Sequence, residues 1–142
     1  MITLDQAQAI IAGTLAQAKA ASLKPLGVVV LDTGGQLIAF ARQDGASFGR
    51  FAIARAKAHG ALAMGDDTAV LAERAKGNPV FFASLVGVLN GDLALSPGGV
   101  LVRDAAGAIV GAVGASGDTG PHDAEAVTAG IAAAGFHAGA AA

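Results

Sequence analysis

Apolar and small residues recur along the chain with the periods of helices and strands, and these periods predict its elements. Helical spacing begins at Thr3 or Asp5 and predicts a first helix that ends near Ser22. The apolar run at 26–31, with three successive valines, has the length and composition of a buried strand. Residues 36–42 alternate well enough to form the returning strand. The first part of the chain is therefore predicted to fold as a helix followed by a hairpin.

A second hairpin and a final helix are predicted further along the chain. Residues 100–103 and 108–115 are strand-like runs, and the sequence DAAG between them has the Asp and Gly that a short connection favours. The sequence DTGG has the same role in the first hairpin. The sequence SGDTG at 116–120 then leads to Pro121, which suits the first turn of a helix. Apolar residues at helical spacing continue this helix to about Ala134.

Between the two hairpins, the spacing predicts helices over 48–64 and 68–76. Gly-Asn-Pro at 77–79 ends the second of these helices, because Pro cannot continue a helix. The apolar run at 80–89 has no clear period, and the pattern assigns it no element beyond a short helical turn over the core with Phe81, Phe82 and Leu85. The tail at 137–142 is expected to be frayed.

The order helix, hairpin, two helices, hairpin, helix predicts an α+β fold, in which an antiparallel sheet of two hairpins carries flanking helices. With 142 residues, the chain is expected to form a single domain over 1–142.

Composition and charge narrow the expected partners. The chain is 54% hydrophobic and only 14% charged, a balance that favours a homo-oligomer. The net charge of −2, without a basic run, argues against nucleic acid. The chain contains no Cys, which excludes disulfides and thiolate chemistry. No secretory pattern and no run of about 18 apolar residues is present, so we expect a cytoplasmic protein that does not bind membranes.

A glycine-rich loop before the last predicted helix is a candidate ligand site. It comprises Ser116, Gly117, Asp118, Thr119 and Gly120. Such a loop leaves backbone N–H groups free at a helix N-terminus, where the helix dipole also favours an anion such as a carboxylate. Alternatively, the side chain of Asp118 or Thr119 fills this position as the helix's own cap.

Lys57, His122 and Asp123 are candidate catalytic residues. Lys57 falls on a largely apolar stripe of its predicted helix, and a desolvated Lys can bind a carboxylate or act as a base. It can instead extend its amine to solvent or pair with Asp32 or Asp123. Together with Arg50 and the loop amides, these groups are an inventory for proton transfer on a small oxyanion-bearing molecule. His122 can ligate a metal, move a proton, or simply face solvent.

Three segments resemble the GlcG/HbpS family of haem-binding or haem-degrading domains. They are VVVLDTGGQLIAFARQDGA in the first hairpin, AKA at 56–58, and GAVGASGDTGPHD after the second hairpin. The resemblance runs from Leu4 to about Gly135. It implies a profilin-like or PAS-like sandwich, oligomeric assembly and, for some members, binding of haem or a related tetrapyrrole. Unlike some members, this chain has no His near the start of the first helix and no pair of acidic residues three apart over 48–64.

Haem would require an axial ligand such as His or Met. The chain offers His59, His122, His137, Met1 and Met64 for that role. His122 and His59 are the candidates for metal binding. The helical pattern places His59 away from the apolar stripes, a position typical of a surface residue.

The binding hypothesis also uses an apolar pocket. Phe48, Phe51 and Met64 are its candidate walls, with Arg50 or Lys57 at the rim to meet the propionates of haem or another planar acid. We favour such a small-ligand or tetrapyrrole-binding protein. The alternatives are an enzyme that moves a proton on a small organic acid, and an oligomeric accessory protein of a catabolic pathway.

Overall fold

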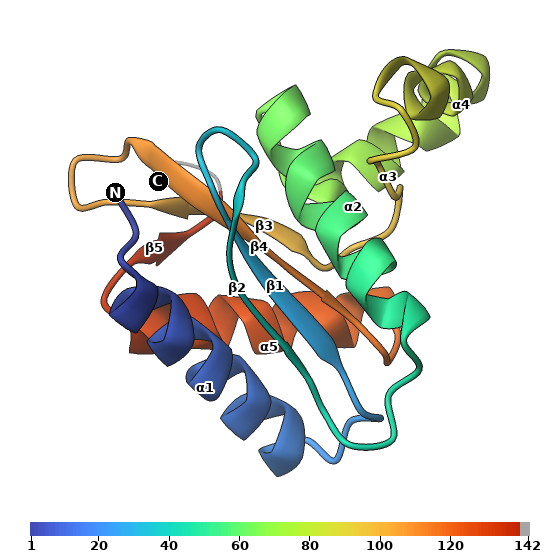
Figure 1. The fold of residues 1–142 in the computed structure, drawn as a ribbon. Coiled ribbons are helices and arrows are strands. Elements are labelled where there is room, and N and C mark those ends of the chain that lie inside the picture. Colours follow the sequence, from blue (N-terminus) through green and yellow to red (C-terminus); the bar gives the residue numbers. More distant parts are fainter. Residues whose placement is uncertain (140–142) are drawn as a thin grey trace.

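The computed structural model of the protein describes residues 1–139, and it has the expected α+β fold (Figure 1). Within these residues the chain forms five helices and five strands. In chain order they are α1 (Leu4–Ala20), β1 (Gly27–Asp32), β2 (Leu37–Arg42), α2 (Gly49–Met64), α3 (Thr68–Gly77), α4 (Pro79–Val88), β3 (Gly99–Arg103), β4 (Ile109–Ser116), α5 (Gly120–Ala133) and β5 (His137–Ala138). Both predicted hairpins and all four predicted helices are present.

The strands form one antiparallel sheet in the order β2-β1-β4-β3-β5. The two hairpins meet through β1 and β4, so that Gly27 lies opposite Ser116 and Asp32 lies opposite Gly111. These two central strands are almost entirely buried, as expected for strands with helices on both faces.

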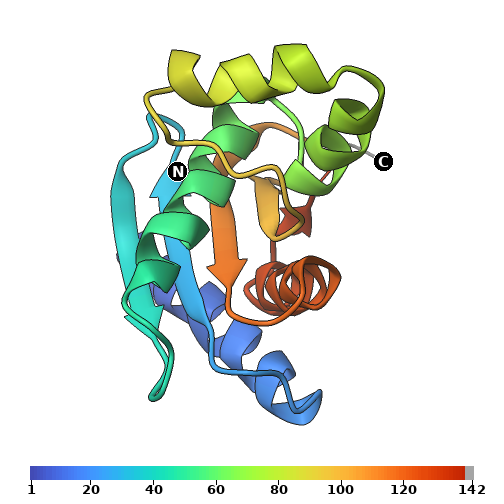
Figure 2. The same cartoon turned by 90° about the vertical axis from the view of Figure 1, so that its right-hand side faces the viewer.

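Helices cover both faces of the sheet (Figures 1 and 2). The helices α1 and α5 pack side by side on one face, where Val28 and Val30 join their core cluster. Helix α2 crosses the other face and packs on Val29 and Leu31. Successive side chains of a strand point to opposite faces, so the run of valines in β1 supplies both cores. Helices α3 and α4 extend beyond the sheet at the upper right of Figure 1.

Glycine allows α2 to approach the sheet closely, and it allows α5 to approach α1 closely. A Cβ atom at Gly114 of β4 would overlap the backbone carbonyl of Ala54 in α2. A Cβ atom at Gly130 of α5 would overlap the side-chain oxygen of Thr14 in α1. At both glycines, a larger residue would therefore have to displace backbone or buried atoms.

Two sequence-based expectations were wrong. The run at 80–89 is not a short turn, because α4 is a helix of ten residues that buries Phe82 and Leu85 against Leu71 and Leu93. The tail is not frayed over its described part, because His137 and Ala138 form β5 and pair with β3. There Arg103 also donates a hydrogen bond to the carbonyl of Gly139 at 2.6 Å. The remainder of the predicted tail, 140–142, lies outside the described residues.

Candidate functional site

Lys57 and Asp123 form a buried ion pair beneath the loop that joins β4 to α5. Their side chains are 4% and 1% exposed, and Nζ of Lys57 lies 3.2 Å from Oδ2 of Asp123. The same Nζ donates to the carbonyl of Ala115 at 3.0 Å. Burial lowers the pKa of Lys57 and raises the pKa of Asp123, while the attraction between the two charges opposes both shifts. The ion pair with Asp123, one of the alternatives for Lys57, is therefore the arrangement in the structure.

The buried polar side chains of this region bind other protein groups. Within residues 1–139, every buried side-chain nitrogen and oxygen has a hydrogen-bond partner. Arg50 reaches the same region from the first turn of α2, where its Nη1 donates to Oγ of the buried Ser116 at 3.0 Å. The polar groups predicted for proton transfer thus bind one another in this conformation.

The glycine-rich loop is held by its own carboxylates. Asp118 accepts hydrogen bonds from the backbone N–H of Thr119 at 2.8 Å and of Lys24 at 2.9 Å. Its own N–H donates to Oδ1 of Asp123 at 3.0 Å. Helix α5 begins at Gly120, as predicted, and Thr119 is its N-cap without a side-chain capping bond. Asp118 and Asp123 therefore bind N–H groups of the loop itself, and neither Asp118 nor Thr119 forms the side-chain capping bond of the self-capping alternative.

His122 lies outside this buried region, in the first turn of α5. Its side chain is half exposed, and Nδ1 lies 2.7 Å from Oδ1 of Asp118. Hydrogen bonds from Lys24, Thr119 and His122 hold the pKa of Asp118 well below its usual range. The same contact raises the pKa of His122. The predicted catalytic residues are therefore separated: Lys57 and Asp123 form the enclosed pair, whereas His122 lies at the surface and contacts Asp118.

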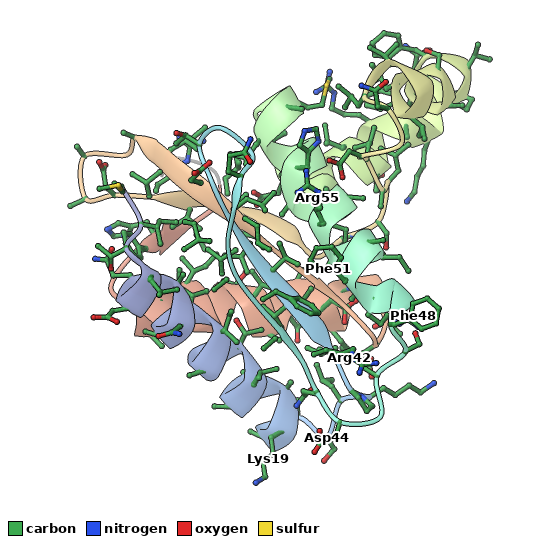
Figure 3. All side chains as sticks on the ribbon, in the orientation of Figure 1. Lys19, Arg42, Asp44, Phe48, Phe51 and Arg55 are labelled. Atoms are coloured by element: carbon green, nitrogen blue, oxygen red, sulfur yellow. The ribbon has the colours of Figure 1, made fainter. Side chains whose placement is uncertain are left out.

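A second candidate site, separate from the buried Lys57–Asp123 pair, lies on the outer side of α2. Figure 3 shows Phe48, Phe51 and Arg55 following one another along this side, and His59 continues the stripe one turn further. Phe51 packs edge to face on Phe40 of β2, with ring centroids 4.8 Å apart.

A hollow of about 440 Å³ lies between this stripe and the chain after α4. Phe51, Val88 and Leu89 supply its apolar lining, and the charged residues Arg55, His59 and Asp92 supply its polar lining. A smaller hollow of about 170 Å³ adjoins His59 on the side of the β1–β2 turn.

The pocket predicted from Phe48, Phe51 and Met64 is not assembled. Phe48 is 87% exposed at the start of α2, and only Phe51 lines the hollow. Met64 lies at the other end of the helix, about 24 Å away at 1.5 Å per residue, and packs beside α3 and α4. Lys57 is buried under the helix and so does not lie at a rim.

His59 is oriented by the loop that follows α4. Its Nδ1 lies 2.8 Å from the backbone carbonyl of Asp92. A carbonyl oxygen can only accept, so Nδ1 carries the proton and, in the neutral ring, Nε2 keeps a free electron pair. The structure records no hydrogen bond to Nε2 within residues 1–139. Arg55 also binds Asp92, with Nη2 3.1 Å from Oδ2.

Among the three histidines, His59 is the one that borders the hollow beside α2. Histidine ligands of metals commonly donate their second ring nitrogen to a carbonyl or carboxylate, as His59 does. His122 is tied to Asp118, His137 lies exposed on β5, and neither of them borders the hollow beside α2. Among the described residues, no group of three or more His, Asp or Glu is arranged to hold a metal ion without such a cofactor.

Sequence reasoning missed the part of this site that comes from the chain after α4. Asn90-Gly91-Asp92 is a clear turn signal, but nothing in the helical period of α2 indicates that this turn packs on His59. The spacing of four residues between Arg55 and His59 was the available signal, since it places both side chains on one side of the helix.

Comparisons with known proteins agree with this architecture. The sequence model of the family described as "haem degrading protein HbpS-like" matches residues 2–132. No curated protein matches the chain. None of the described helices is both long enough and apolar enough to cross a bilayer.

Several solved structures share the fold. HbpS of Streptomyces reticuli, solved as a double mutant, is 27% identical, with 92% of this chain and 84% of that chain covered and a TM-score of 0.79. PduOC, solved in complex with haem, is 22% identical, with 93% and 94% covered and a TM-score of 0.82. The protein ORFY of Klebsiella pneumoniae is 23% identical, with 94% and 90% covered and a TM-score of 0.84. The last two likenesses concern the fold alone, whereas the family match spans nearly the whole sequence, and the chain belongs to the HbpS-like family of haem-degrading proteins.

Proposed function

We propose that this protein binds haem or a closely related tetrapyrrole in the hollow beside α2, with Nε2 of His59 as the axial ligand. The observation that carries the proposal is the state of His59: its Nδ1–H is bound to the Asp92 carbonyl, and the ring borders a hollow with both apolar and charged lining. Membership of a family described as haem degrading supports the choice of ligand.

The surrounding residues have separate roles in this proposal. Phe51, Val88 and Leu89 offer apolar surface to a flat ring system and exclude water from one side of it. Arg55 at the edge of the hollow is the cation for a ligand carboxylate, and Asp92 holds it there at 3.1 Å until the ligand arrives. Haem, when bound, supplies redox and oxygen chemistry, which belongs to the cofactor itself.

The backbone carbonyl of Asp92 fixes the tautomer of His59. If the ring instead carried its proton on Nε2, that nitrogen would have no electron pair for iron. The backbone contact depends on the shape of the 90–92 turn, and Oδ2 of Asp92 also lies 3.6 Å from the same Nδ1. The enzymatic alternative stays a prediction, and Lys57, its candidate base, is enclosed and bonded within the protein. The accessory alternative also stays a prediction.

A haemin titration followed by Soret absorbance tests this proposal. We expect a saturable, stoichiometric spectral change in the wild-type protein. His59→Ala should weaken binding roughly tenfold or more and alter the Soret band, because it removes the iron ligand. His122→Ala is the matched control, an exposed histidine in a helix, and should leave the titration unchanged.

Two results would overturn the proposal. One is a titration of wild-type protein that never saturates, which indicates non-specific association. The other is an identical Soret band and affinity in His59→Ala, which would remove His59 as the ligand even if haem binds elsewhere. Arg55→Ala should lower affinity while preserving the wild-type band, because a propionate contact does not touch the iron.

A further inference from the structure

Within residues 1–139, strand β2 has a free edge with hydrogen-bonding groups that no other element uses. The N–H of Gln43 donates to the carbonyl of Leu26 in the chain leading into β1, and Val28 and Val30 lie opposite Ala41 and Ala39. Antiparallel pairs alternate between bonded and non-bonded positions, so Ala39 and Ala41 bond to β1. The N–H and C=O groups of Phe40 therefore point away from the sheet.

This edge lacks the usual features that prevent pairing with another strand. Over Leu37–Arg42 there is no Pro and no charged residue except Arg42 at the end. Figure 2 shows β2 at the outer border of the sheet, and within residues 1–139 no further element lies beyond it. Two apolar side chains on it are exposed, Leu37 at 47% and Phe40 at 37%.

The side chains of β2 also suit a second copy of the same strand. In an antiparallel pair about a two-fold axis at Phe40, Phe40 lies opposite Phe40 of the partner subunit, and the two aromatic rings share one face of the sheet. Arg42 then lies opposite Ile38 of the partner subunit. Each strand brings only this one charge, so the two-fold pairing places no like charges opposite each other.

We propose that β2 pairs antiparallel with β2 of a second copy, in the register that sets Phe40 against Phe40, to form one continuous sheet of ten strands. The low charged content of the chain, 14%, is consistent with an assembly in which apolar surface is shared between copies. The pairing is tested at positions 37 and 40 of β2, whereas haem binding is tested at His59 and Arg55 of α2. A haemin titration and a test of the pairing therefore report on separate proposals.

Cysteine cross-linking tests both the partner and the register. The natural chain has no Cys, so Phe40→Cys and Leu37→Cys each carry a single thiol. In the proposed register the two residues at position 40 face each other at a Cα separation of about 5.5 Å, which a disulfide spans. The two residues at position 37 lie about 20 Å apart, six positions at 3.4 Å each. Leu37→Cys is thus a matched control on the same strand, at a more exposed position.

We expect Phe40→Cys to form a disulfide-linked dimer roughly tenfold faster than Leu37→Cys under the same oxidant, on non-reducing gels. Light scattering of the wild-type protein should give an even number of 13.7 kDa chains. Phe40→Lys should reduce that number, because it sets two lysines opposite each other. Equal cross-linking at positions 37 and 40, or a monomeric wild-type protein, would overturn the pairing. Circular dichroism identifies any variant that has failed to fold.

Discussion

At the scale of single residues, Lys57 and Asp123 are two buried charges that must compensate each other. Both charges are withdrawn from water, and each depends on the other for compensation. A buried pair of this kind adds little net stability compared with an apolar pair, but loss of one partner leaves the other charge buried alone. The pair thus fixes how α2 and α5 meet under the glycine-rich loop.

We predict that Lys57→Met lowers the free energy of unfolding by about 3–5 kcal/mol, because it strands the Asp123 carboxylate. Asp123→Asn keeps an acceptor for the Asp118 N–H but strands the ammonium, and it should be destabilising as well. The double variant should lose clearly less than the sum of the two single variants. Urea unfolding of the four proteins measures this coupling, and strictly additive losses would contradict it.

The contact of His122 with Asp118 should make stability depend on pH. The pKa of His122 is raised in the folded protein, so its contribution is complete below its ordinary value of 6.5 and is lost as the pH rises through the higher folded value. The pKa of Asp118 is lowered, so its contribution is present above its ordinary value of 3.8 and is lost only as the pH falls through the lower folded value.

The difference in unfolding free energy between the wild-type protein and His122→Ala should therefore be largest near pH 5 and shrink towards about pH 9. Urea denaturation over this range measures the difference. Asp118→Asn should reduce its pH dependence strongly, because it removes the largest cause of the raised histidine pKa, while Glu125 and Asp123 add smaller contributions. A difference that stays constant with pH would refute the role of the contact.

At the scale of residues, one part of the site was predicted from the sequence and another part was not. The pairing of Lys57 with Asp123 was among the alternatives, because an apolar stripe that contains one amine requires a nearby counter-charge. The environment of His59 was not foreseen. Its position on α2 indicates exposure, but the 90–92 turn covers part of the ring, and contacts between segments so distant in sequence leave no periodic signal.

At the scale of elements, the close packing of α2 on the sheet depends on glycine in β4. We predict that Gly114→Ala destabilises the fold by about 1–3 kcal/mol, because the new Cβ overlaps the carbonyl of Ala54 and α2 must move. Gly87→Ala is the matched control inside helix α4, where a Cβ meets open space.

Gly87→Ala should instead raise the free energy of unfolding by about 0.5–1 kcal/mol, because Ala is favoured over Gly in a helix. Both changes are measured by chemical denaturation. A stability loss in Gly87→Ala, or a Gly114→Ala variant as stable as the wild type, would show that packing against α2 is not what requires glycine in β4.

Elements whose ends carry turn or capping residues were predicted well, and others were not. The hairpins end at Asp- and Gly-containing turns, and α1 begins with a capping box at Thr3 and Gln6. Helix α4 has almost no polar positions, so its helical period cannot be seen in the sequence pattern. Strand β5 has only two residues, too few for an alternation to be visible.

At the scale of the whole molecule, the α+β class followed from the order of elements, and the family followed from three motifs. The order of the strands did not follow. Each hairpin is a local structure that sequence signals can reveal, but the contact of β1 with β4 joins the two hairpins across most of the chain. No local pattern specifies that contact, and the site beside α2 depends on it because α2 packs on both strands.

The pairing of β1 with β4 has a consequence for how the protein is made. On the ribosome, the first hairpin emerges long before its central partner does, and α2 follows with nothing to complete the face on which it packs. One edge of β1, opposite the edge paired with β2, must remain unpaired until Gly111 to Ser116 have been synthesised. Such late closure slows folding, and it leaves apolar strand surface open to aggregation until the second hairpin is complete.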